Sequence, residues 1–98
     1  MENNVHINKA VNVVAFYFKN AGPAYRQAGS RLKCFPKRME YDGRRVEFTE
    51  TGLRHPVQKG KSLVHVFDMT DGNADYRLEF DAQNLDWKLV SIADAFRA

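Results

Sequence analysis

The chain has little cysteine: Cys34 is the only one among 98 residues, so no internal disulfide can form. A lone thiol is typical of proteins kept in a reducing compartment, which predicts a cytoplasmic location. The opening residues Met1–Asn4 lack the basic and apolar regions of a secretory signal peptide. No apolar run is long enough to span a bilayer, so we expect no membrane partner.

Sequence patterns of catalysis and metal binding are missing as well. The six glycines stand singly at positions typical of turns, which excludes a glycine-rich phosphate loop. His65 and Asp68 lie three apart in an expected strand and therefore point to opposite faces, unlike metal ligands. Cys34 has no partner base at a recognisable spacing. We expect no catalytic residue, no metal site and no cofactor, and we predict that the protein is not an enzyme.

Apolar side chains, by contrast, are plentiful. Hydrophobic residues make up 44% of the sequence and aromatic residues 12%. This content is sufficient for one buried core in a chain of ordinary domain size. The sequence shows no repeat, linker or low-complexity segment. We therefore expect residues 1–98 to form a single domain.

The N-terminal third carries apolar side chains at helical spacing, which predicts a helix from Val5 to Asn20. The apolar stripe consists of Ile7, Val11, Val14 and Phe18. The opposite side carries Asn8, Lys9, Asn12 and Lys19. Gly22 and Pro23 are suited to end the helix, and a short helical turn is expected over Pro23–Ala28. A strand is the competing prediction because the segment is rich in valine and phenylalanine.

The remainder of the chain favours strands. Asp42-Gly43 predicts the tight turn of a hairpin over Met39–Phe48. Clean alternation predicts a second hairpin over Leu63–Asp81, and a last strand is expected at Trp87–Ile92. The stretch Thr51–Lys61 is expected to be the longest loop. The predicted fold is therefore α+β, with the N-terminal helix packed on a curved, mainly antiparallel meander of about five strands. This layout resembles that of many small bacterial domains, without any motif that carries a function.

Charge is unevenly distributed along the chain. Residues 26–61 contain ten lysines and arginines against four acidic residues, whereas residues 62–98 contain three against seven. A basic segment interleaved with aromatics is typical of proteins that bind single-stranded nucleic acid. Phe16 projects from the polar side of the expected helix and is a candidate anchor for a partner. The candidate binding residues are Phe16, Arg31, Lys33, Lys37, Arg38, Arg44, Arg45, Arg54 and His55.

Three hypotheses follow from these patterns. The first is a non-enzymatic interaction module that binds a protein partner and self-associates. The second is nucleic-acid binding through residues 26–61. The third is a small apolar ligand held between the helix and the sheet. The residues expected to line that third site are Val14, Phe18, Phe48, Tyr76, Phe80 and Trp87.

Overall fold

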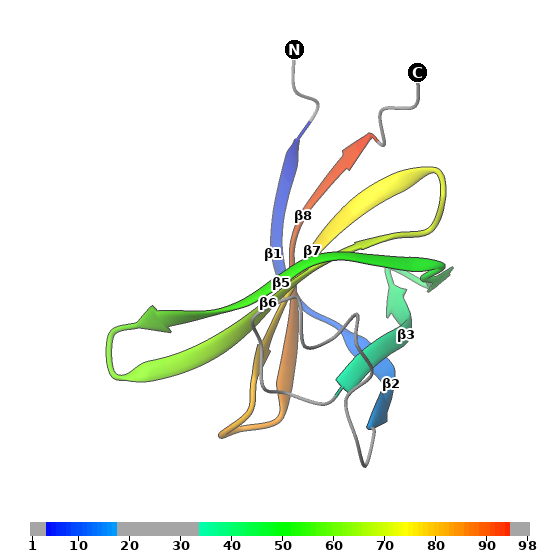
Figure 1. Cartoon of the computed structure of the whole chain (residues 1–98). Helices are drawn as coiled ribbons and strands as arrows, with labels where there is room; N and C mark the ends of the chain where they lie inside the picture. Colours follow the sequence, from blue (N-terminus) through cyan, green and yellow to red (C-terminus); the bar gives the residue numbers. More distant parts are fainter. Residues whose placement is uncertain (1–3, 18–33, 95–98) are drawn as a thin grey trace.

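The computed structural model describes residues 4–17 and 34–94, which form eight β-strands and no helix (Figure 1). In chain order the strands are β1 (Val5–Ala10), β2 (Asn12–Tyr17), β3 (Cys34–Tyr41), β4 (Arg44–Glu47), β5 (Glu50–Lys59), β6 (Ser62–Thr70), β7 (Ala74–Asp81) and β8 (Asp86–Asp94). The fold of the described chain is therefore all-β, and the expected α+β class is wrong.

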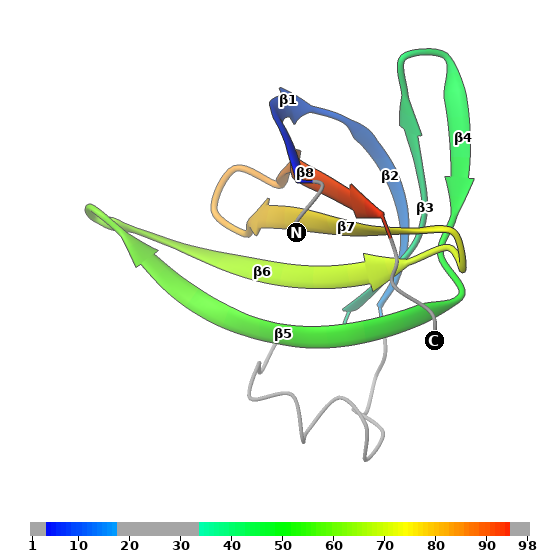
Figure 2. The ribbon, with the colours of Figure 1, turned by 90° about the horizontal axis from the view of Figure 1, so that it is seen from above.

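The strands form two antiparallel sheets. The larger sheet has the order β1-β8-β7-β6-β5, and the smaller has the order β2-β3-β4. The strands of the small sheet run crosswise to those of the large one (Figure 2). The chain passes between the sheets twice, from β1 to β2 and from β4 to β5. At the first passage the Val11 N–H donates a hydrogen bond to the Trp87 carbonyl at 3.1 Å, and at the second the Phe48 N–H donates to the Lys37 carbonyl at 2.9 Å.

A single core lies between the sheets. Its buried members are Cys34, Met39, Val46, Phe48, Phe67, Met69, Tyr76, Leu78, Phe80, Trp87 and Leu89. Trp87 is the centre of an aromatic group, with ring centroids 4.6 Å from Phe80 and 5.3 Å from Phe67. Contributions from both sheets to one core explain why the described strands form one domain.

The helix expected over Val5–Asn20 is wrong where the structure describes it, because β1 and β2 occupy residues 5–17. Exposure alternates strictly along residues 11–16, with half-buried odd positions and exposed even positions. A period of two is the period of a strand, and the β-branched Val11, Val13 and Val14 favour it. The apparent helical stripe arose from valines that face both sides of a sheet. The helical turn expected at Pro23–Ala28 lies outside the described residues.

The two expected hairpins form. Tyr41 pairs with Arg44 around the Asp42-Gly43 turn, and Thr70 pairs with Asp75 around the second turn. The loop expected at Thr51–Lys61 is wrong, since β5 runs through most of it and turns into β6 at Gly60-Lys61. Pro56 is tolerated there because β5 is an edge strand.

Candidate interaction surface

The outer face of the small sheet combines polar rows with exposed apolar side chains. Residues directly opposite one another on neighbouring strands share a face. One cross-strand row consists of Val14, Arg38 and Glu47, and the next consists of Asn12, Glu40 and Arg45. Phe16 lies two residues beyond Val14 and therefore points to the same side. We refer to these seven residues as the small-sheet face.

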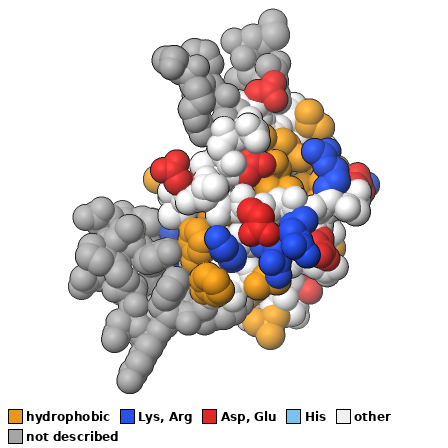
Figure 3. Space-filling model, turned by 90° about the vertical axis from the view of Figure 1, so that its right-hand side faces the viewer, with side chains coloured by type: hydrophobic (Ala, Val, Ile, Leu, Met, Phe, Trp, Pro, Cys, Tyr) orange, Lys and Arg blue, Asp and Glu red, His pale blue; other side chains and the backbone are white. Residues whose placement is uncertain are grey.

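The charges of the small-sheet face balance. Nη1 of Arg38 lies 3.7 Å from Oε2 of Glu47, and both side chains are partly exposed. Arg45 lies directly opposite Glu40. Lys/Arg and Asp/Glu side chains interleave on the side of the molecule that carries β2 and β3, with hydrophobic side chains next to them (Figure 3). Two arginines and two glutamates leave this face without net charge, and such exposed pairs contribute little to stability.

Two exposed apolar side chains lie together on this face. Val14 is 46% exposed and Phe16 is 50% exposed. The other large hydrophobic residues exposed in the described chain are Val5, Leu53, Leu63 and Leu85. Those four lie on different strands or turns, whereas Val14 and Phe16 are neighbours on one face of one strand. Single exposed apolar residues are ordinary, but a neighbouring pair is a candidate contact surface.

The backbone of β2 has one edge that no other strand of the described chain covers. Within the described residues only β3 pairs with β2 in the small sheet. In a hairpin with a two-residue turn, the backbone N–H and C=O groups of the two flanking residues point toward each other. Here these residues are Tyr41 and Arg44. Antiparallel alternation then directs the backbone of Arg38 and Glu40 toward β2. Val13 lies between Asn12 and Val14, the residues opposite Glu40 and Arg38, and therefore directs its N–H and C=O away from β3.

Two shallow hollows lie beside these residues. One, of about 100 Å³, is lined by Asn12, Val13, Val14, Arg38 and Glu40. The other, of about 550 Å³, is lined by Asn12, Glu40, Asp42, Gly43, Arg44 and Arg45. The two hollows share Asn12 and Glu40, so the small-sheet face continues into the hollow at the tip of the β3–β4 hairpin. A hollow beside exposed apolar groups favours a contact with another macromolecule.

The structure separates the candidate binding residues. Phe16, Lys37, Arg38, Arg44 and Arg45 lie on the small sheet, and Arg54 and His55 lie on β5 of the large sheet. Arg31 and Lys33 lie outside the described residues. The consecutive Arg44 and Arg45 point to opposite faces of β4. The described residues therefore do not assemble the basic segment into one track.

Arg54 is fully buried, with its guanidinium carbon 4.7 Å from the centroid of the Phe67 ring. A cation over an aromatic face is an attractive contact. Burial, together with the positive charge of Arg54, lowers the pKa of His65 below its usual value. Arg54 is thus part of the interior and is not available on the surface as the sequence suggested.

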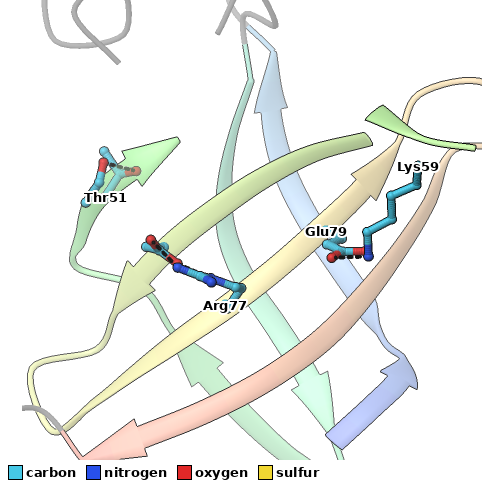
Figure 4. A network of polar contacts seen from close by, with 6 residues as sticks. Thr51, Lys59, Arg77 and Glu79 are labelled. Carbon is cyan, nitrogen blue, oxygen red and sulfur yellow. Dashed lines mark hydrogen bonds and ion pairs between the residues drawn. The ribbon is translucent and has the colours of Figure 1, made fainter. Parts of the chain in front are cut away.

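The outer face of the large sheet carries paired charges (Figure 4). The Lys59 ammonium donates to Oε2 of Glu79 at 2.7 Å, and the Arg77 guanidinium donates to both oxygens of Asp68 at 2.8 and 3.1 Å. These cross-strand pairs use the carboxylates within the sheet. The described part of the chain shows no cluster of three or more His, Cys, Asp or Glu side chains placed to hold a metal ion.

Sequence reasoning placed Phe16 and Arg38 among its candidate residues but did not expect Val14 on the surface, because the helical interpretation placed it toward the core. The run of β-branched residues around Val14 was the available signal.

Among residues 4–17 and 34–94 there is no helix long and apolar enough to cross a membrane. Comparison with protein-family models, curated proteins and solved structures finds no match for this chain.

Proposed function

We propose that this chain is a non-enzymatic interaction module that self-associates through the small-sheet face. The observation that carries the proposal is the pair of exposed apolar side chains, Val14 and Phe16, on a strand that contains no charged residue. Aromatic and arginine side chains are enriched at protein interfaces, and Phe16 lies beside the row that contains Arg38.

A second copy of the chain suits this face better than a partner of strong charge. The two arginines and two glutamates of the small-sheet face balance one another, so these four groups add no net repulsion between two copies. A strongly acidic or basic partner gains no net attraction from a neutral surface. Most homo-oligomers are two-fold symmetric, and in such an interface each copy contributes the same patch.

The other hypotheses have less support. Nucleic-acid binding stays a prediction, but Arg38 and Arg45 each face a glutamate, and phosphate binding requires cations whose charge is not already compensated. The apolar-ligand hypothesis requires a helix on one side of the ligand site, and residues 5–17 form no helix. Phe48, Tyr76 and Phe80 fill the core between the sheets instead.

Substitution of the apolar pair tests the proposal. We expect the wild-type chain to dimerise in sedimentation equilibrium, and Phe16→Thr to raise the dimer dissociation constant at least about tenfold. Threonine keeps the strand propensity of the position but removes most of the apolar area. Burying a large apolar side chain contributes about 1.5–3 kcal/mol, and about 1.4 kcal/mol corresponds to tenfold in affinity.

A matched control separates the small-sheet face from apolar exposure in general. Val14→Thr and Val5→Thr make the same change at positions that are 46% and 57% exposed. Only Val14→Thr is expected to weaken the dimer, because Val5 lies on β1 in the other sheet. A wild-type chain that sediments as a monomer at high concentration, or equal weakening by both substitutions, would contradict the proposal.

A further inference from the structure

We propose, building on the self-association above, that two copies join by antiparallel pairing of β2 with β2 of the second copy. In this arrangement Ala15 faces Ala15 of the second copy across the two-fold axis, and Val14 lies opposite Phe16 of the second copy. The small sheets of the two copies then form one continuous six-stranded sheet.

The four edge strands of the two sheets differ in their protection against such pairing. Natural proteins protect edges with charge, proline, bulges or shortness. β4 is four residues long and mostly charged, and β5 contains Pro56, the buried Arg54 and a bulge. β1 contains Lys9 and a register shift after His6. β2 has the sequence Asn-Val-Val-Ala-Phe-Tyr, without charge or proline.

β2 is also regular along its own length. Val14 pairs with Arg38 and Ala15 pairs with Pro36, so the extra residue of the register shift, Lys37, belongs to β3. The alternation of β2 is therefore unbroken, and the N–H and C=O groups that point to the free edge belong to Val13, Ala15 and Tyr17. Pro36 lies opposite a residue whose backbone points away from it, which is a position where its missing N–H costs nothing.

One register uses all of these backbone groups. Pairing Ala15 with itself across a two-fold axis also pairs Val13 with Tyr17 of the second copy. The same register places Val14 directly opposite Phe16 of the second copy, and symmetry creates this contact twice. Cross-strand pairs of an aromatic and a β-branched residue are favourable. The exposed apolar side chains of both copies then cover one another on the outer face.

Disulfide trapping tests the register. Chains carrying Val14→Cys and chains carrying Phe16→Cys are mixed at equal concentration and oxidised with glutathione disulfide. Directly opposite residues have Cα atoms about 4.5 Å apart, which suits a disulfide. Two copies of position 14 lie two residues out of register, about 8 Å apart, which is too far. We expect the mixed disulfide to exceed either symmetric one at least about fivefold. Cys34 is fully buried, and peptide mapping identifies which cysteines are joined.

A second pair of variants leaves the apolar contact intact. Ala15→Cys is expected to form a dimer disulfide, whereas Val13→Cys, on the same face of β2, is expected to form little. Sedimentation of the same samples reports whether they are dimeric. Dimers that give no preferred disulfide would overturn the strand pairing while leaving self-association standing. Dimers with equal trapping at positions 13 and 15 would overturn the register. A wild-type chain that forms no dimer would instead contradict the proposed function, and with it the strand pairing.

Discussion

The side chain of Asp71 organises the turn between β6 and β7. Its Oδ1 accepts hydrogen bonds from the N–H groups of Asn73 and Ala74 at 2.8 and 2.9 Å, and its Oδ2 accepts one from the Tyr76 hydroxyl at 2.9 Å. Burial alone would raise the pKa of Asp71, but these hydrogen bonds outweigh it and lower the pKa. Burial and the neighbouring carboxylate raise the pKa of Tyr76 to about 12.

We expect Tyr76→Phe to reduce the free energy of unfolding by about 1 kcal/mol at pH 7, because it removes one hydrogen bond to a partly buried carboxylate. The contribution of the tyrosine is complete below its ordinary pKa of 10.0 and is lost as the pH rises toward about 12. The contribution of ionised Asp71 is lost as the pH falls below 3.8 through its lowered pKa. Urea unfolding across this range should therefore show a difference between wild type and variant that shrinks at both extremes. A difference independent of pH would show that the hydroxyl contact is not its source.

Single residues also show where sequence reasoning stops. The turn at Asp71 was predictable because turn chemistry resides in adjacent residues. Arg54 was counted among candidate surface cations, yet it is 0% exposed. Its burial depends on pairing with Phe67 on β6, and no local pattern around Arg54 reports that pairing.

At the scale of elements, the sequence-based predictions were right where the signal is local and wrong where a strand depends on a partner distant in the sequence. The β3–β4 hairpin was predictable from Asp42-Gly43 alone. β1 was not, since its strand conformation depends on β8, with Val5 paired to Ile92 near the other end of the described chain. β5 was not predicted because its sequence contains Gly52 and Pro56, and glycine and proline usually interrupt strands. The edge of β2 could not be foreseen while the segment was interpreted as a helix.

The β3–β4 turn gives a prediction at this scale. Asp42 has φ 52° and Gly43 has φ 72°, both in the left-handed region. A Cβ at Gly43 would meet no atom within 4 Å, so the cost of Gly43→Ala comes from the backbone alone. We expect this substitution to destabilise the chain by about 1 kcal/mol, measured by thermal unfolding. Asp42→Asn serves as the control and should not destabilise, because Asn-Gly favours the same turn. Equal midpoints for Gly43→Ala and wild type would contradict this account.

At the scale of the whole molecule, the charge asymmetry of the sequence does not become a corresponding asymmetry of surfaces among residues 4–17 and 34–94. Of the cations in residues 34–61, Arg54 is buried and Lys59 pairs with Glu79 on the large sheet. Arg38 pairs with Glu47 on the small sheet. Folding disperses the positive segment because neighbouring positions of a strand point to opposite faces and β4 and β5 belong to different sheets. We therefore base the predicted partner class on the exposed apolar pair, Val14 and Phe16, and not on net charge along the sequence.

Salt dependence distinguishes the two partner classes for the intact chain. Dimerisation through a neutral face with an apolar contact should change less than about threefold between 50 and 500 mM salt, since few counterions are released. Binding of a single strand that neutralises about six phosphates would instead lose on the order of 10⁴-fold in affinity over the same range. Sedimentation equilibrium measures the first quantity, and fluorescence anisotropy of labelled single-stranded DNA and RNA measures the second. A dimer that dissociates steeply with salt would place charge pairs, rather than Val14 and Phe16, at the interface. Micromolar binding of nucleic acid with a steep salt slope would make the cations of residues 26–61 the functional surface, although those within residues 34–61 are divided between two sheets.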